Sequence, residues 1–212
     1  MMLIENHASN STNDFFNIIF EGLKEIIGCE DCSEIQQDCF ARDKKELLEI
    51  KDLSFEYLFN DELTNLQKSF VQRYRQRGAK GMAVQVGSAA FKYFLRKYGK
   101  ESGLTSLDYR ITPAMKRYPI GLNKLAEIVK ENTHYRVSVQ EDDSSWLWIV
   151  NNGLYEKQGD ADEFIRNYFF GMLQAYMTWA SSGKIFSISD VTAEMDSPAS
   201  CSLKILREPI EN

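Results

Sequence analysis

Residues that bind transition metals or act as general bases are scarce in this sequence, which has only two histidines and four cysteines among 212 residues. The G-x-G-x-x-G fingerprint of dinucleotide-binding folds is absent, and Gly78-Ala79-Lys80-Gly81 lacks the rest of a P-loop. Paired carboxylates, Ser/His/Asp or Cys/His sets and an H-E-x-x-H pattern do not stand out either. The sequence therefore provides no catalytic residues and favours a protein that is not an enzyme.

Long hydrophobic runs are also missing. No window contains about 18 uncharged apolar residues, and residues 1–10 lack the basic start and apolar run of a secretory signal. Lys and Arg number 25 against 31 Asp and Glu, so the net charge is -6 and a general phosphate-binding surface is disfavoured. We expect a cytoplasmic protein with no transmembrane segment and no nucleic-acid partner, and we leave peripheral contact with a membrane open.

Three of the four cysteines lie close together in the pattern C-x2-C-x6-C: Cys29, Cys32 and Cys39. The first two have the spacing of zinc ligands, and the third offers another thiolate. However, no second C-x2-C follows, His7 and His134 are remote in sequence, and acidic neighbours raise thiol pKa values. We expect reduced, unliganded thiols in a connecting segment, with zinc as the weaker alternative. Cys201 alternates with Leu203 and Ile205, which predicts a small buried hydrophobic residue.

The most informative segment is the predicted helix from Asp160 to Gly183, with Asp160 as its N-cap and Gly183 as its stop. Apolar and aromatic residues form two neighbouring stripes along it: Phe164, Tyr168, Met172 and Trp179 on one, and Ile165, Phe169, Leu173 and Tyr176 on the other. No broad polar face remains, so this helix has to be covered on several sides.

Hydrophobic periodicity predicts helices first and strands later. The expected helices are Ser11–Ile27, Asp61–Gln76, Met82–Lys100, Pro119–Glu131 and the segment just described; the expected strands are Tyr135–Gln140, Trp146–Val150, Lys184–Thr192 and Cys201–Leu206. Turns at Asp142–Ser145 and Asp196–Ser200 join the strands into two hairpins. This order predicts an α+β fold, with the helices packed on one side of a four-stranded antiparallel sheet.

Two local patterns add detail to this fold. The small residues Gly87, Ser88, Ala89 and Ala90 allow another backbone to come close, which implies tight helix contact. The strand Trp146–Val150 is apolar on both faces, so we expect it to be an inner strand whose second face is also covered.

Three segments resemble the 4-vinyl reductase domain, also called the hydrocarbon-binding domain. They are Val86–Pro113, with the small-residue patch, Arg136–Val150, with the first hairpin, and Asp162–Ile205, with the closing helix and hairpin. The family is similar in fold to the small subunits of the TRAPP vesicle-tethering complex and to heme-based nitric-oxide sensors. The resemblance covers about Met82 to Arg207 and implies a hydrocarbon-binding domain at 81–207. Residues 1–80 would be an N-terminal helical extension packed on that core, within a single structural unit.

The resemblance implies a pocket for a small apolar molecule between helices and sheet, and pairing with a second copy through the helices. Members in phototrophs are linked to chlorophyll or bacteriochlorophyll formation and to photosystem assembly. This chain departs from the family in its cysteines, because Asn151–Leu154 and Thr192–Asp196 stand where many relatives have them. With Cys201 alone retained, we do not expect the family's metal site in this chain.

The main functional prediction is binding of a hydrophobic ligand, a chlorophyll-type tetrapyrrole or a lipid, by a carrier, sensor or assembly factor. The predicted ligand-binding residues are Phe94, Trp146, Trp148, Phe169, Met172, Tyr176 and Trp179. Aromatics at helical spacing usually fill a core instead, and a structural or dimerisation adaptor would use the same apolar surface. A vinyl reductase or its accessory subunit is the weaker alternative. His134 could ligate a tetrapyrrole metal, although a surface histidine at a strand start is more common.

Overall fold

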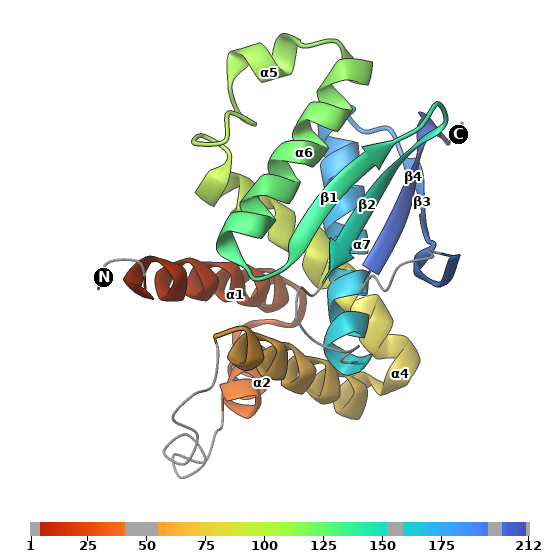
Figure 1. Ribbon diagram of the computed structural model, residues 1–212. Coiled ribbons are helices and arrows are strands. Elements are labelled where there is room, and N and C mark those ends of the chain that lie inside the picture. Colours follow the sequence, from red (N-terminus) through yellow and green to blue (C-terminus); the bar gives the residue numbers. More distant parts are fainter. Residues whose placement is uncertain (1–4, 41–54, 152–158, 195–200, 211–212) are drawn as a thin grey trace.

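The computed structural model describes residues 5–40, 55–151, 159–194 and 201–210 (Figure 1). The elements follow in the order α1 (Glu5–Ile27), α2 (Cys29–Phe40), α4 (Phe55–Tyr98), α5 (Leu107–Ile111), α6 (Ala114–Asn132), β1 (Arg136–Glu141), β2 (Ser145–Asn151), α7 (Gly159–Ala180), β3 (Phe186–Asp190), the short 3-10 helix η1 (Thr192–Glu194) and β4 (Cys201–Pro209). The predicted α+β architecture is confirmed. One hydrophobic core includes residues from both sides of position 80, such as Phe15, Leu63 and Trp148.

The four strands form one antiparallel sheet in the order β1-β2-β4-β3, so β2 is an inner strand as predicted. The first hairpin turns where expected, because one carboxylate oxygen of Asp142 accepts hydrogen bonds from the backbone N–H groups of Ser144 and Ser145, both at 2.7 Å. Trp148 of β2 points at α7, where its ring centroid lies 5.6 Å from that of Phe169. The sheet therefore packs its inner face directly on the aromatic helix.

Glycines allow α4 to cross two other helices at very short range. A Cβ atom at Gly87 would lie 1.9 Å from the carbonyl oxygen of Tyr168 in α7, and one at Gly171 would lie 1.9 Å from that of Val84. At Gly22 of α1, a Cβ atom would lie 2.8 Å from the carbonyl oxygen of Val86. The close helix contact predicted from the small residues around Gly87 is therefore confirmed, and it occurs within the chain.

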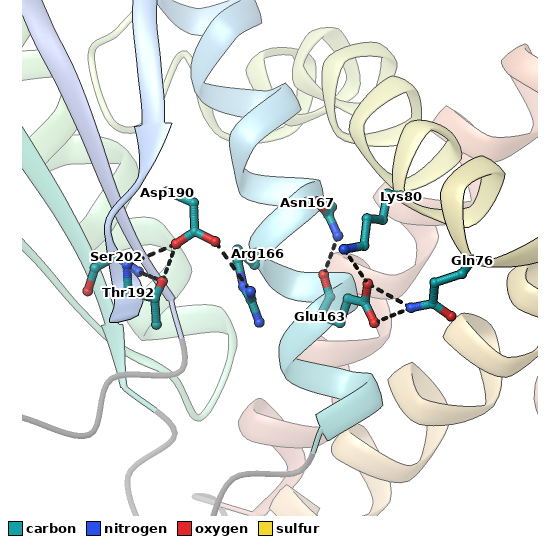
Figure 2. A network of polar contacts seen from close by, with 8 residues as sticks. All are labelled: Gln76, Lys80, Glu163, Arg166, Asn167, Asp190, Thr192 and Ser202. Carbon is teal, nitrogen blue, oxygen red and sulfur yellow. Dashed lines mark hydrogen bonds and ion pairs between the residues drawn. The ribbon is translucent and has the colours of Figure 1, made fainter. Parts of the chain in front are cut away.

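Polar contacts fix the first half of α7 between α4 and β3 (Figure 2). The carboxylate of Glu163 accepts hydrogen bonds from the side-chain amide of Gln76 at 2.9 and 2.8 Å, and it lies 3.4 Å from the ammonium of Lys80. On the other side of α7, the guanidinium of Arg166 pairs with the carboxylate of Asp190 at 3.3 Å. These contacts set the rotation of α7, and with it the directions in which its aromatic residues point.

Several predicted helix boundaries were wrong. α1 begins at Glu5 rather than Ser11, since no proline or glycine interrupts residues 5–10, whereas Gly28, with φ 86, follows its end as expected. The cysteine-rich segment is not a connector but α2, whose first turn carries Glu30 and Asp31 at the end where the helix dipole favours acids. The break inside α4 falls at Arg75, with φ 59, and not at Gly78.

The region around Pro113 and Pro119 also differs from the prediction. α6 begins at Ala114 with Pro113 as its N-cap, so Pro119 lies inside the helix instead of starting it. The short helix α5 was not predicted; the side chain of Ser106 caps it by accepting a hydrogen bond from the backbone N–H of Tyr109. The turn predicted at Asp196–Ser200 and the segment Asn152–Leu154 lie outside the described residues.

Candidate functional site

The structure places six of the seven predicted ligand-binding residues in the core, with no exposed surface: Phe94, Trp146, Trp148, Phe169, Met172 and Tyr176. Within this core they pack against different neighbours, and none of the six is among the residues that line the two cavities described below. Trp148 contacts Phe169 between sheet and α7, whereas Trp146 contacts Tyr118 of α6, with ring centroids 5.8 Å apart. Trp179, in the last turn of α7, is only partly buried, and it lines two neighbouring cavities.

The larger cavity, which we call the Trp179 groove, has a volume of about 530 Å³. Its lining residues come from α4, α7 and the start of β3: Ser88, Gln174, Ala175, Met177, Thr178, Trp179, Ile185 and Phe186. None of these side chains carries a charge, and five of them are apolar. Small-molecule sites typically enclose about 300–1,000 Å³ with mainly apolar walls, so the groove has the size and chemistry of such a site.

Aromatic neighbours hold the Trp179 ring in place between the two cavities. The ring of Tyr109 stacks on it with centroids 5.9 Å apart and an interplanar angle of 12°, and the edge of Phe91 approaches at 5.9 Å. These contacts come from α5 and α4, so Trp179 joins the end of α7 to both helices. The indole is therefore a fixed wall, not a freely rotating surface side chain.

Two tyrosine hydroxyls beneath this wall form a buried polar cluster. The hydroxyl of Tyr176 donates to the backbone carbonyl of Tyr118 at 2.7 Å and lies 3.0 Å from the hydroxyl of Tyr109. Burial raises the pKa of Tyr176 well above its ordinary value, so the hydroxyl stays protonated. Gly121 makes room for both groups, because a Cβ atom there would lie 2.1 Å from one hydroxyl oxygen and 2.3 Å from the other.

The smaller cavity, which we call the Arg117 cavity, lies on the other side of Trp179 and has a volume of about 280 Å³. It is lined by Tyr109, Arg110, Arg117, Trp179, Ala180 and Ser182. The guanidinium of Arg117 donates to the carbonyl oxygens of Ala180 at 2.6 Å and Arg110 at 2.8 Å. Within the described residues, neither arginine forms an ion pair with a carboxylate. Both arginines therefore bring positive charge to the wall of this cavity.

Among the described residues that line the two cavities, none has an imidazole or a thiolate that could hold a tetrapyrrole metal. Of the two histidines, only His134 has a described side chain; its ring lies 4.3 Å from that of Tyr135, and it lines neither cavity. Met177 provides the only sulfur among their lining residues, and haem proteins with a methionine ligand pair it with histidine. The described lining of the two cavities therefore offers no complete ligand set for a haem iron.

The cysteines are placed apart from these cavities. Cys29 is exposed, whereas Cys32, Cys39 and Cys201 are buried, and all four thiols are free. Burial raises the pKa of Cys39 to about 12 and also raises that of Cys201, which keeps both thiols protonated. Among the residues with described positions, no three His, Cys, Asp or Glu side chains gather as metal ligands would.

No protein-family model matches this chain, and no curated protein sequence matches it. The chain is similar in fold to an H-NOX protein. A mutant H-NOX of T. tengcongensis superposes with a TM-score of 0.54 at 10% sequence identity, covering 94% of this chain and all of that one. A second structure, from work on the molecular mechanism of H-NOX activation, has a TM-score of 0.48 and 12% identity, with coverage of 93% and 97%.

The resemblance to the 4-vinyl reductase family was wrong, since no family model or curated protein supports it and the solved structure that superposes with a TM-score of 0.54 is an H-NOX protein. The resemblance rested mainly on the order of the helices and strands, which is not specific to one family. The order of helices, hairpin, helix and hairpin describes how layers connect, and the H-NOX fold has the same α+β layout. At 10% identity the similarity concerns the fold alone.

The sequence prediction missed several residues that line the two cavities, including Tyr109, Arg110, Arg117 and Ile185. The first three belong to α5, for which no element was predicted, and to the first turn of α6, which lies before the predicted helix start at Pro119. A local signal was present, because Ser106 precedes an apolar residue and an acid, as an N-cap often does. Ile185 has no comparable local signal; the fold alone places it beside α7.

Proposed function

We propose that this protein is a non-catalytic binding domain for a small, uncharged, hydrophobic molecule such as a lipid, which it carries or senses. The observation that carries the proposal is the Trp179 groove, which has a volume of about 530 Å³ and no charged side chain among its described lining residues. An unpaired charge would be costly to bury, so walls without charge favour an apolar ligand over water or an ion. The pigment and photosystem roles lose their basis with the family resemblance and are not part of the proposal.

Two side chains that line the groove would lose the most solvent exposure when a ligand binds. Ile185 is about half exposed, and Trp179 is partly exposed where it packs against the core. Covering a fully exposed side chain of this kind contributes about 1.5–3 kcal/mol, so covering these two partly exposed ones contributes about 2 kcal/mol in total. The buried aromatic residues that the sequence predicted to bind the ligand would then not contact it. They would hold Trp179 and α7 in position from within the core.

The alternative is a structural adaptor, in which the helices of a second copy of the chain would cover this surface. The small residues around Gly87 suggested such pairing, but part of this patch already packs within the chain. The backbone of Gly87 contacts that of Tyr168 in α7, with no room for a Cβ atom between them. A partner helix would have to use the residues beside it. We therefore favour a ligand over a partner chain in the groove.

The proposal can be tested with the neutral hydrophobic dye Nile red, whose fluorescence rises in apolar sites. Ser88 is exposed on the wall of the groove, so Ser88→Phe fills part of it and should weaken Nile red binding at least about tenfold. Ser189→Phe makes the same substitution at another exposed position, which lines neither cavity, and should leave binding unchanged. Native mass spectrometry of protein purified from its own host should also detect a bound apolar molecule.

Equal dye binding by Ser88→Phe and the unsubstituted protein, with both folded, would exclude the groove as the site. A chain that carries no small molecule and sediments as a tight dimer, with Ser88→Phe shifting it to monomer, would instead establish the adaptor. A metal tetrapyrrole would be recognised from its absorption spectrum and would contradict a metal-free ligand.

A further inference from the structure

Large apolar side chains are exposed together at one end of the molecule. Leu107 is 72% exposed, Ile111 70% and Met115 54%, and they follow one another at intervals of four residues from α5 into the first turn of α6. We call residues 107–117 the apolar tip. In Figure 1, α5 lies at the upper end of the molecule, far from α1 and α2. Several large apolar side chains exposed within nine residues of a folded protein are unusual, and larger exposed apolar patches usually mark a binding surface.

The tip is held rigidly, so its exposure is not that of a loose loop. Tyr109 is the only buried residue of α5; its ring stacks on Trp179, and its hydroxyl lies 3.0 Å from that of Tyr176. Ser106 caps the helix, and the backbone N–H of Thr112 bonds to the carbonyl oxygen of Asp108 at 3.2 Å. With Tyr109 pointing inward, Leu107 and Ile111 must face outward.

The charge of the tip is opposite to that of the chain. Residues 107–117 contain the cations Arg110, Lys116 and Arg117 and a single acid, Asp108, whereas the whole chain has a net charge of -6. Exposed apolar side chains beside lysine and arginine are typical of segments that lie in the interface of a bilayer containing anionic lipids. None of the described helices is long and apolar enough to cross a bilayer, so any contact would be at the surface.

We propose that the apolar tip docks on the surface of a membrane that contains anionic lipids. Leu107, Ile111 and Met115 enter the boundary between headgroups and acyl chains, while Arg110 and Lys116 meet the lipid phosphates. A second copy of this chain is disfavoured as the occupant, since two cationic tips placed face to face would repel each other. This inference does not depend on the ligand in the Trp179 groove.

Sedimentation with vesicles of phosphatidylcholine, alone or mixed with phosphatidylglycerol, tests the proposal. The intact protein should bind the mixed vesicles several-fold more strongly, and added salt should reduce the difference. Leu107→Ser with Ile111→Ser should lower the partition coefficient by about tenfold or more. Ile26→Ser with Ile210→Ser, at apolar positions 37% and 52% exposed outside the tip, should leave it unchanged.

Replacing the charges separates the two contributions. Arg110→Gln with Lys116→Gln should abolish the preference for phosphatidylglycerol and keep the weak binding to phosphatidylcholine alone. Circular dichroism and the melting temperature check that each variant is folded. The proposal is overturned if the intact protein ignores both vesicle types, or if the tip and control variants bind alike. It is also overturned if the tip variant converts a dimer to a monomer, which would make the tip a protein interface.

Discussion

The crossing of α4 and α7 predicts opposite effects for the same substitution at two glycines of one helix. At Gly87 the new methyl group of alanine would lie 1.9 Å from the carbonyl oxygen of Tyr168, whereas ordinary contacts begin at 3.4 Å. The helices would have to separate by about 1.5 Å along that contact. The obstructing atom is backbone, so no side chain can rotate away. Overpacking of this kind costs typically about 1–3 kcal/mol, and we take the upper end.

Alanine also favours the helix over glycine by about 1 kcal/mol, so the net loss for Gly87→Ala is about 2 kcal/mol. For a chain of this size that corresponds to a melting temperature about 4–8 °C lower. Gly81 is six residues away in α4, is exposed, and has nothing within 4 Å of the position of a Cβ atom. Gly81→Ala should therefore raise stability by about 0.5–1 kcal/mol.

Urea denaturation followed by circular dichroism and by tryptophan fluorescence measures both variants under the same conditions. Because Trp148 packs against Phe169 of α7, its fluorescence should report loss of this packing together with loss of helix. If Gly87→Ala were as stable as Gly81→Ala, the two helices would not meet backbone to backbone, and the arrangement of the core around α7 would be wrong.

Three further results are expected from particular groups. Gly121→Ala should destabilise the protein and increase exposure of tryptophan, measured by acrylamide quenching, because its methyl group would displace the two tyrosine hydroxyls that support Trp179; unchanged quenching would contradict this. Hydrogen bonds from Ser144 and Ser145 hold the pKa of Asp142 below its ordinary value, so its stabilising effect is complete above about pH 4 and is lost as the pH falls. Asp142→Ala should thus melt below the unsubstituted protein at pH 7, with the gap closing in acid; a gap independent of pH would refute the role of the charge. A thiol reagent should modify the exposed Cys29 quickly in the native protein and the buried Cys32, Cys39 and Cys201 only on unfolding. Rapid labelling of all four cysteines in the native protein would contradict the burial of the other three.

Local chemistry was enough to predict most of the elements. Apolar residues at helical spacing marked α7, alternation marked β1, and the turn at Asp142 depended on a side chain bonding to nearby backbone groups. Gly28, directly after α1, has a φ of 86, which other residues rarely adopt, so this helix end is also encoded locally. The end of α7 differs from the prediction, because the helix stops at Ala180 and Ser182, with φ 62, takes the left-handed conformation ahead of Gly183. Such features involve residues close in sequence, and no tertiary contact is needed to recognise them.

The candidate site could not be recognised in this way. Trp148 and Trp179 look alike in the sequence, yet one is fully buried under the sheet and the other forms the wall of an open groove. The difference arises because β2 is covered by α7, while the last turn of α7 extends to α5 and Ile185. Likewise, the sequence around Leu107 and Ile111 is compatible with burial of both residues. They are exposed because Tyr109, between them in α5, faces inward and stacks on Trp179.

The sequence of the aromatic segment 160–183 was sufficient to predict a helix and to predict that other elements bury it on several sides, since both follow from the spacing and apolarity of its residues. Which side chains are covered, and by what, depends on groups far away in sequence: Gly87 sets how closely α4 approaches, Gln76 and Asp190 set the rotation of α7, and Tyr109 holds Trp179. Each of these contacts joins segments separated by tens of residues. A groove is space left between such segments, and only their packing together determines where it lies.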